Sequence, residues 1–107
     1  MTTIKNTKKS SIILATEALK EGNLVSFPTE TVYGLGGDAT NNLAIAKIFE
    51  TKNRPEFNPL IIHFSSFDQV EENCEINDDI KKLNDLFWPG PIAVILKRKK
   101  ESKISEL

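Results

Sequence analysis

Apolar residues recur along this chain with helical spacing in some segments and in short continuous runs in others, and polar caps, glycines and prolines separate these segments. The first helical segment runs from a cap at Ser10 or Ser11 to Gly22, which suits the left-handed position after a helix end. Its apolar positions are Ile12, Ile13, Ala15, Ala18 and Leu19. The pattern therefore predicts a first helix that Gly22 closes.

Three further helices are predicted from their caps. Asn41 precedes a second run of helically spaced apolar residues, and Ser66 followed by Gln69 has the spacing of a capping box. Asn77 can cap the last helix. That helix must stop at Pro89-Gly90-Pro91, because proline cannot continue a helix.

Three short apolar runs have the length of buried strands. They are Leu24–Phe27, Leu60–Phe64 and Ile92–Leu96. Between the first run and the second helix, Pro28–Asp38 contains one proline and three glycines, and we expect a long shaped loop there. The order α-β-α-β-α-α-β predicts an α/β or α+β fold, in which helices flank a sheet.

Composition narrows the class of protein. The 107 residues suffice for one small domain, and 39% hydrophobic with 27% charged residues is typical of a soluble globular protein. The 14 Lys and Arg nearly balance the 15 Asp and Glu, which argues against a surface built wholly for nucleic acid. Cys74 is the only cysteine, which excludes an internal disulfide and a cysteine-based zinc cluster. His63 is the only histidine, which excludes most hydrolytic triads. No apolar stretch is long enough for a membrane span or a signal-peptide core, so we expect a cytoplasmic protein without a membrane partner.

The loop Pro28–Gly36 is the first candidate for chemistry. It follows a predicted strand, and open α/β sheets place ligands at the carboxyl ends of their strands. Thr29, Glu30 and Thr31 offer two hydroxyls and a carboxylate to a small polar ligand. An ordinary turn, in which the threonines bond their own backbone, explains the pattern equally well. The glycines that follow fit a relaxed dinucleotide-binding pattern, but they lie too far from the strand for that motif.

The second candidate is Lys52-Asn53-Arg54-Pro55. Proline favours an extended residue before it, and an extended segment would place Lys52 and Arg54 on one side, roughly 6.6 Å apart. Two cations with that spacing suit a polyphosphate, because Arg supplies a planar donor fork and Lys a point charge. A solvated loop with two ordinary cations is the alternative, and the pattern alone favours it.

Several other features have plain structural explanations. His63, on a predicted strand, is more often a structural residue than a catalytic one. The basic run Lys97–Lys100 can contact RNA phosphates but is more often a solvated strand end. Cys74 lacks an evident activating cation and is interpreted as incidental.

These segments together resemble the YrdC-like family of threonylcarbamoyl-AMP synthases. Pro28–Gly36 matches the family signature P-T-E-T-V-Y-G-L-G at every position, and Lys52, Arg54 and Pro55 match its K-x-R-P. Asn58-Pro59-Leu60 matches the following N-P-L. Ile61-Ile62-His63 and Phe87–Pro91 are similar to the later I-V-H and F-W-P-G-P elements. The resemblance runs from about Ser10 to Leu96, in the family's order.

The resemblance implies a twisted mixed sheet with flanking helices around a deep, positively lined cleft. It also implies a reaction in which L-threonine, bicarbonate and ATP give threonylcarbamoyl-AMP and pyrophosphate, with Mg2+ accompanying the nucleotide. Partner proteins would then pass the product to the adenosine at position 37 of certain tRNAs. No protein nucleophile is implied, because attack of a carbamate on the α-phosphorus needs positioning and charge neutralisation instead.

The same resemblance assigns two sets of binding residues and no metal ligand. The residues expected around the threonine pocket are Thr29, Thr31 and His63. The residues expected around ATP are Lys52, Arg54 and Asn58. We expect these residues to share one cavity, with His63 at its edge rather than in a closed core.

Two departures from the family pattern qualify the expected activity. Ile92-Ala93 stands where the family usually has Leu-Thr, which removes a hydroxyl near the site. No counterpart of the family's later Ser-x-Asn element is found before Leu107. Residues 1–107 are therefore expected to form a single YrdC-like domain that is incomplete at its C-terminus. Two alternatives stay open, a double-stranded RNA-binding module and an inactive truncated remnant, and a related hydrogenase-maturation domain is disfavoured.

Overall fold

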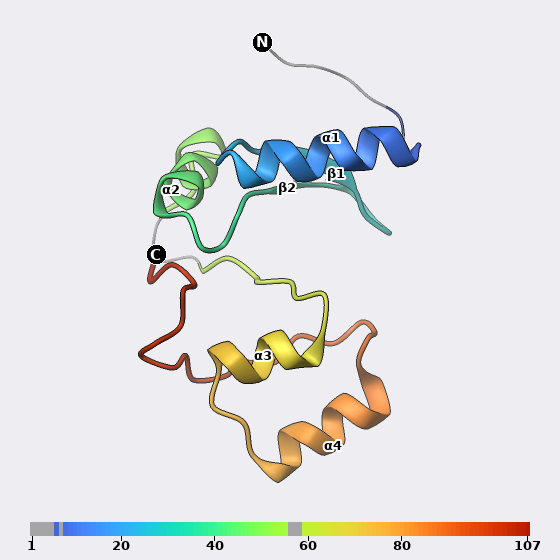
Figure 1. Ribbon diagram of the computed structural model, residues 1–107, viewed down its shortest axis with the longest axis vertical. Helices are drawn as coiled ribbons and strands as arrows, with labels where there is room; N and C mark the ends of the chain where they lie inside the picture. Colours follow the sequence, from blue (N-terminus) through green and yellow to red (C-terminus); the bar gives the residue numbers. More distant parts are fainter. Residues whose placement is uncertain (1–5, 7, 56–58) are drawn as a thin grey trace. The chain divides into compact units, whose positions relative to one another are not determined.

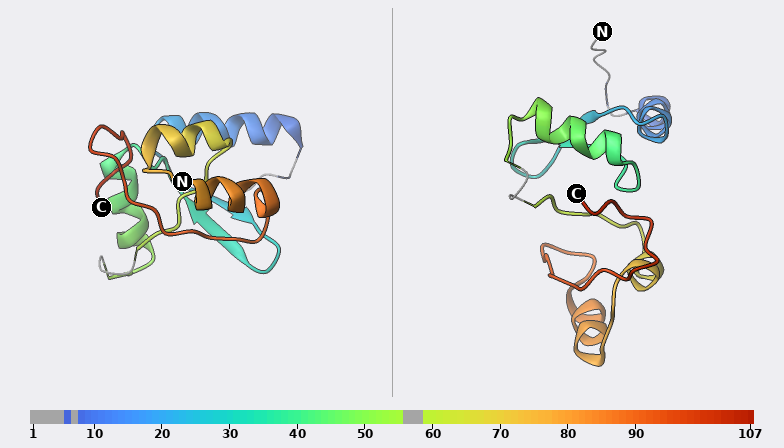
Figure 2. Two further views of the ribbon diagram at one scale, coloured as in Figure 1. Left: turned by 90° about the horizontal axis from the view of Figure 1, so that it is seen from below. Right: turned by 90° about the vertical axis from the view of Figure 1, so that its left-hand side faces the viewer.

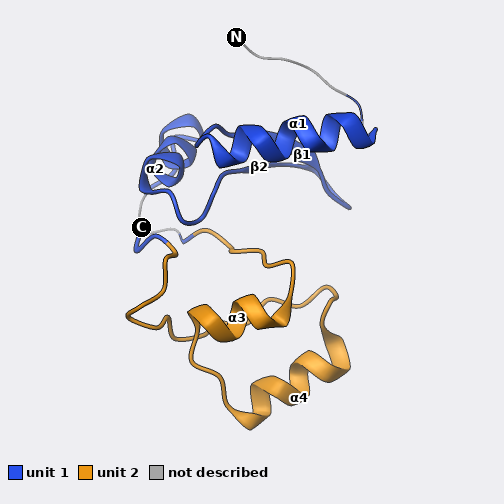
Figure 3. Ribbon diagram, in the orientation of Figure 1, with its two compact units in different colours: residues 1–59, 105–107 blue, residues 60–104 orange. Residues whose placement is uncertain are grey.

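The computed structural model describes residues 6, 8–55 and 59–107, and within them the fold is α+β (Figure 1). The elements are α1 (Lys9–Lys20), β1 (Val25–Pro28), β2 (Tyr33–Gly36), α2 (Asn42–Thr51), α3 (Phe67–Asn73) and α4 (Asp78–Phe87). The chain divides into two compact units (Figure 3). The first unit comprises residues 1–59 and 105–107, and the second comprises residues 60–104. The predicted fold class is thus confirmed as α+β.

An antiparallel hairpin of β1 and β2 forms the sheet of the first unit. Val25 pairs with Gly36 at one end, and Pro28 pairs with Tyr33 beside the turn. Helix α1 runs alongside this hairpin, as Figures 1 and 2 show. The hairpin is the whole of the sheet within the described residues, so both of its outer edges lack a neighbouring strand there.

Strand β2 corrects the prediction that Pro28–Asp38 is one long loop. Tyr33–Gly36 lies in regular register with β1, although two of its four residues are glycine. The ring of Phe27 lies over these glycines, and a Cβ at Gly36 would come within 2.8 Å of Phe27 Cε1. The glycines therefore make room for a neighbouring ring within a strand, rather than marking a loop.

Helix α1 ends where the sequence predicts. Gly22 has φ of 86°, and its N–H donates to the Leu19 carbonyl at 3.0 Å while the Asn23 N–H donates to Ala18 at 3.0 Å. This pair of hydrogen bonds is the Schellman motif, which satisfies carbonyls that the helix end leaves free.

The predicted N-cap of α1 at Ser10 or Ser11 is wrong. The helix begins at Lys9, its N-cap position is Lys8, and the Lys8 side chain makes no capping bond. The Asn6 amide oxygen accepts from the Lys8 N–H and from the Ser11 hydroxyl, both at 3.0 Å. Asn6, two residues before the N-cap position, thus supplies the side-chain acceptor at the start of the helix that was expected from a serine.

Helix α2 provides the core of the first unit. Asn41 caps it as predicted, accepting from the Leu43 and Ala44 N–H groups at 3.0 and 3.1 Å. The buried face of the helix consists of Ala44, Ile45, Ile48 and Phe49. Burial of this face is the main apolar contribution to the unit. The Lys47 ammonium donates to the Gly22 carbonyl at 3.2 Å, which ties α2 to the end of α1.

The second unit contains α3 and α4, and their caps also follow the prediction. The Ser66 hydroxyl accepts from the Gln69 N–H at 3.4 Å, while the Gln69 side chain accepts from the Ser65 N–H at 3.0 Å. Asn77 accepts from the Ile80 N–H at 2.9 Å and caps α4. The capping box is thus present with one difference. The Gln69 side chain accepts from the N–H of Ser65 instead of from the N–H of the N-cap residue Ser66.

The ends of α3 and α4 are joined by aromatic side chains. The rings of Phe67 and Trp88 have centroids 6.4 Å apart in a tilted arrangement, within the range of favourable aromatic pairs. Helix α4 ends at Phe87 as predicted, and the following Trp88–Pro89 peptide bond is cis. The Trp-Pro-Gly-Pro segment therefore acts as a helix stop with an aromatic anchor.

The predicted strands Leu60–Phe64 and Ile92–Leu96 are not strands in this structure. Both segments are irregular, and the nearest pairing is an isolated antiparallel bridge between Cys74 and Arg98. The two strand predictions are wrong, because a strand requires not only suitable residues but also a neighbour with which to exchange hydrogen bonds. The described residues supply no neighbour for either segment.

Candidate functional site

The turn between β1 and β2 holds two of the predicted threonine-binding residues. The Thr29 hydroxyl accepts from the Val32 N–H at 3.2 Å and from the Thr31 N–H at 3.4 Å, and it donates to the Val32 carbonyl. The Thr29 N–H also donates to that carbonyl at 3.1 Å. Thr29 therefore shapes the turn, as the turn interpretation predicts. The neighbouring Thr31 side chain is exposed, and within the part of the chain that the structure describes no such backbone bond engages its hydroxyl.

The segment after α2 holds the two predicted phosphate-binding cations, and its geometry differs from the prediction. Lys52 has helical dihedrals of −86° and −4° and forms the C-cap of α2, while Asn53 has a left-handed φ of 51°. The extended geometry that was expected for these two residues is wrong. The helix end decides the conformation, because Asn tolerates the left-handed position better than most residues do.

Hydrogen bonds fix the position of Arg54 relative to the helix end. The Asn53 N–H donates to Glu50 at 3.1 Å and the Arg54 N–H donates to Phe49 at 2.9 Å, which is a second Schellman motif. The Arg54 guanidinium Nη2 donates to the Pro59 carbonyl at 3.0 Å. Arg54 is half-buried whereas Lys52 is exposed, so the two cations differ in how firmly they are held.

Asn58 and His63 complete the predicted set. Asn58 lies outside the described residues. His63 belongs to the second unit and is exposed, so it is not enclosed in an apolar core. The structure thus brings Thr29 together with Thr31, and Lys52 together with Arg54. A single cavity containing all of these residues remains a prediction.

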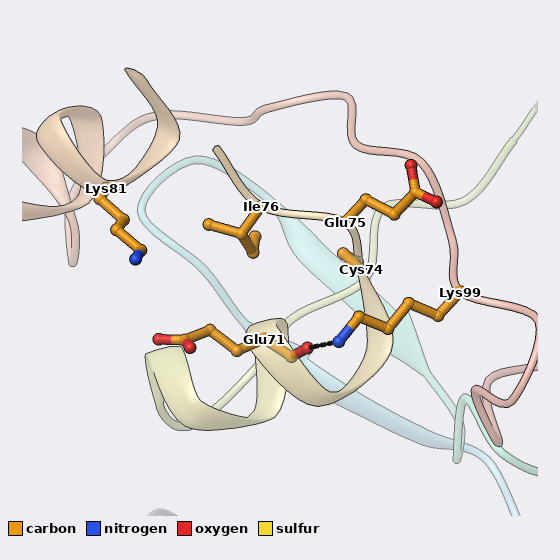
Figure 4. A pocket seen from close by; sticks show the side chains of 6 residues that line it. All are labelled: Glu71, Cys74, Glu75, Ile76, Lys81 and Lys99. Atoms are coloured by element: carbon orange, nitrogen blue, oxygen red, sulfur yellow. Dashed lines mark hydrogen bonds between the residues drawn. The ribbon is translucent and has the colours of Figure 1, made fainter. Parts of the chain in front are cut away.

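Sequence reasoning missed a hollow in the second unit. It has a volume of about 370 Å³ and contains none of the predicted site residues (Figure 4). Its lining residues are Glu71, Cys74, Glu75, Ile76, Lys81 and Lys99. The Lys99 ammonium donates to the Glu71 backbone carbonyl at 2.6 Å across this hollow. Charges of both signs around Cys74 were visible in the sequence, but nothing there indicated that Lys99 turns back toward α3.

The surroundings of Cys74 disfavour its thiolate form. Burial raises the pKa of the Cys74 thiol above its usual value, and the nearby positive charge of Lys99 offsets part of this effect. A protonated thiol is a poor nucleophile and a poor metal ligand. The interpretation of Cys74 as chemically incidental therefore fits its surroundings.

The described part of the chain contains no group of three or more His, Cys, Asp or Glu side chains positioned to hold a metal ion. We therefore assign no described residue as a ligand of magnesium. Nor does any helix within the described residues have the length and apolar character needed to cross a membrane.

The fold and these segments define an α+β protein with a threonine-bearing hairpin turn and a cationic helix end. The family model Sua5_yciO_yrdC, described as "Telomere recombination", matches residues 17–107. The chain therefore belongs to the Sua5/YciO/YrdC family.

Relatives named threonylcarbamoyl-AMP synthase are similar to much of this chain. The protein from Pyrococcus abyssi is 50% identical over 86 residues, which are 79% of this chain and 25% of the relative. The protein from Bacillus subtilis is 44% identical over 92 residues, which are 85% of this chain and 27% of the relative. A putative threonylcarbamoyl-AMP synthase from Methanocaldococcus jannaschii is 36% identical over 93 residues, which are 86% of this chain and 44% of that protein. The chain thus spans about a quarter to under half of these relatives.

Solved structures of Pyrococcus abyssi Sua5 share the backbone fold. A doubly substituted form superposes with a TM-score of 0.85 at 42% identity, covering 94% of this chain and 31% of that one. A second structure, a complex with L-threonine, superposes with a TM-score of 0.73 at 47% identity, covering 80% of this chain and 26% of that one.

Proposed function

We propose that this chain carries part of the substrate site of a threonylcarbamoyl-AMP synthase, which acts in the synthesis of threonylcarbamoyladenosine in tRNA. The observation that carries the proposal is the 50% identity to a relative of that name. The Sua5 structure that contains L-threonine, at 47% identity, supports threonine as a substrate. The activity itself belongs to the longer relatives, of which this chain spans a part.

In this proposal the two segments of the first unit have different tasks. The hairpin turn presents Thr31 to the threonine while Thr29 holds the turn in shape, and His63 lies beside the same substrate. Lys52 and Arg54 neutralise the phosphates of ATP, with Asn58 close by. A carbamate oxygen of threonylcarbamate then attacks the α-phosphorus, and pyrophosphate leaves with the electrons of the broken P–O bond.

The remaining participants follow from the same reaction. ATP and bicarbonate are the other two substrates, and magnesium enters with the nucleotide. The product is passed to tRNA-modifying proteins in the cytoplasm. Direct contact with RNA is a weaker proposal, because Arg98 and Lys99 of the basic run Lys97–Lys100 donate to backbone carbonyls of their own chain.

The proposal is tested by nucleotide binding to the full chain. We expect Lys52→Met and Arg54→Met each to weaken binding of ATP, measured by isothermal titration calorimetry, by roughly ten- to a hundredfold, since one charge-assisted hydrogen bond contributes about 1.5–3 kcal/mol. Lys20→Met, which removes an exposed cation at the end of α1, is the matched control and should leave the affinity unchanged. Equal loss in all three variants would show a general charge effect and would refute the assigned site.

A second measurement separates the enzyme from the RNA-binding alternative. We expect this chain by itself to bind ATP weakly and to release no pyrophosphate. A phosphate that is contacted from one side remains hydrated on the other, and in that high-dielectric surrounding each charge–charge contact contributes little. Salt-dependent binding of double-stranded RNA without any ATP affinity would favour the RNA-binding module instead.

A further inference from the structure

The hollow in the second unit is lined by charges of both signs in equal number (Figure 4). Its ammonium groups belong to Lys81 and Lys99, and its carboxylates belong to Glu71 and Glu75. Lys81 comes from α4 and Glu71 from α3, so two different helices supply opposite charges to the same cavity. A lining with balanced charges complements a ligand that has no net charge of its own.

Two of these four charged side chains are already engaged within the chain. The Lys99 ammonium donates to the Glu71 backbone carbonyl at 2.6 Å, and the Glu75 carboxylate lies 4.0 Å from the Lys97 ammonium. Within the described residues, the Glu71 carboxylate and the Lys81 ammonium have no hydrogen bond or ion pair. In Figure 4 these two groups extend toward the same end of the hollow. One negative and one positive group are thus left for a ligand.

The wall beside these two groups is apolar or weakly polar. Ile76 and Cys74 are half-buried, and both line the hollow. In the view of Figure 4 the Ile76 side chain projects between Lys81 and Cys74. The volume of about 370 Å³ lies at the small end of the range of ligand sites, which is roughly 300–1,000 Å³. The hollow therefore has room for a small molecule with one short apolar part.

We propose that this hollow binds a zwitterionic α-amino acid with an aliphatic side chain. The Lys81 ammonium pairs with the carboxylate of the ligand, the Glu71 carboxylate pairs with its ammonium, and Ile76 contacts its aliphatic part. A simple anion fits less well because the two glutamates repel it, and a simple cation fits less well because Lys81 repels it. The proposal does not depend on the substrates proposed above, because the hollow contains none of the residues assigned to them.

Binding is tested with the full 107-residue chain and with L-leucine as the probe. Cys74 is the only cysteine and lines the hollow, so its alkylation by iodoacetamide at fixed pH reports on access to this cavity. We expect leucine to slow the alkylation of Cys74 in a saturable manner. Half-saturation should occur in the millimolar range, because a small ligand in a site open to water makes few contacts.

Two analogues of leucine each lack one of its charged groups. Isocaproate has the same aliphatic part and the carboxylate but no ammonium, and isoamylamine has the ammonium but no carboxylate. Each analogue forms only one of the two proposed ion pairs. Both should therefore protect Cys74 less well than leucine does at the same concentration.

Variants of the two charged residues locate the site. Lys81→Met and Glu71→Gln should each weaken protection by leucine about two- to fivefold, which is the range for ion pairs that are open to solvent. Lys82→Met and Glu72→Gln are the matched controls, because these exposed residues adjoin the first two on the same helices but do not line the hollow. Each variant is compared with its own alkylation rate without leucine, because a changed charge near Cys74 alters that rate directly.

Three results would overturn the proposal. The first is the absence of protection by leucine at every concentration up to its solubility limit. The second is protection by isocaproate or by isoamylamine equal to that by leucine, which would show that a zwitterion is not required. The third is equal weakening in the two control variants, which would indicate a general effect of charge instead of contacts in the hollow.

Discussion

The two units of this chain are stabilised in different ways. In the first unit, one face of α2 buries four apolar residues, and the hairpin pairs β1 with β2 along four positions. In the second unit, the buried apolar residues within the described chain are Val70 and Ile104, and Ser102 is buried as well. Backbone bonds from the Glu75 N–H to Lys97 and from the Lys99 N–H to Asn73, both 2.8 Å, connect distant parts of that unit. Side-chain bonds from Lys99 to Glu71 and from Ser102 to Asn73 add to them.

The second unit is held at its C-terminal end chiefly by Arg98. Its guanidinium donates to the carbonyls of Ile104, Ser102 and Lys99 at 2.7 to 3.1 Å. The Ser102 hydroxyl also donates to the Asn73 side chain at 2.6 Å. A unit with this few buried apolar contacts depends on individual hydrogen bonds, whereas the first unit depends on packed area. Loss of a buried apolar side chain should therefore lower the free energy of unfolding more in the first unit than in the second.

The largest effect is expected from truncation of the core of α2. Phe49 is 7% exposed, and Phe49→Ala should cost about 3–5 kcal/mol through lost burial and a cavity. Val70→Ala in the second unit removes two methyl groups and should cost only about 1.5 kcal/mol. Hydrogen exchange in α2 would measure the first change and Trp88 fluorescence in urea the second. Equal shifts of both probes in both variants would show one cooperative body and contradict the comparison.

A smaller loss is expected from Arg98→Met. Removal of several charge-assisted bonds to carbonyls should destabilise the second unit by about 2–3 kcal/mol. The matched control is Lys97→Met, because Lys97 is exposed and its contact with Glu75 is a 4.0 Å surface ion pair of little energetic value. Urea unfolding monitored by Trp88 fluorescence distinguishes the two variants. A control as damaging as Arg98→Met would show that net charge, and not the hydrogen bonds, is responsible.

The smallest effect concerns the pH dependence of Cys74. Because burial raises the pKa of this thiol, the folded chain holds the proton more tightly than the unfolded chain does. Folding therefore loses a little stability as the pH rises through the unfolded and then the folded pKa. Alkylation should have its midpoint at higher pH in the native chain than in urea. Lys99→Met should raise the native midpoint further, and a fall would contradict the assigned role of Lys99.

Helix ends were the part of the fold that the sequence predicted best. Asn41, Ser66 and Asn77 each accept the hydrogen bond expected of a cap, because a cap depends on a side chain and an N–H two or three residues away. Strand pairing was predicted poorly, because it depends on a partner elsewhere in the chain. Strand β2 was missed for that reason, and two apolar runs were assigned as strands without a neighbour.

For the candidate site, the sequence identified the residues but not the geometry in which they lie. The motif identified Thr29, Thr31, Lys52 and Arg54 as one family pattern, but their local geometry depended on bonds that the motif does not describe. Asn53 adopts a left-handed conformation because a helix ends there, whereas the extended preference that Pro55 imposes concerns Arg54, the residue directly before it. Their assembly into one cavity involves distant contacts, which residue spacing along the chain does not specify.

The loop around Arg98 resembles a metal-binding loop in which the guanidinium of Arg98, a part of the chain itself, takes the place of the metal ion. Carbonyl oxygens of Lys99, Ser102 and Ile104 converge on one positive charge, as they would on a bound calcium ion. A guanidinium is covalently part of the chain and cannot be extracted by a chelator. This loop consequently has a permanent internal cation, and its shape does not depend on the supply of any ion from solution.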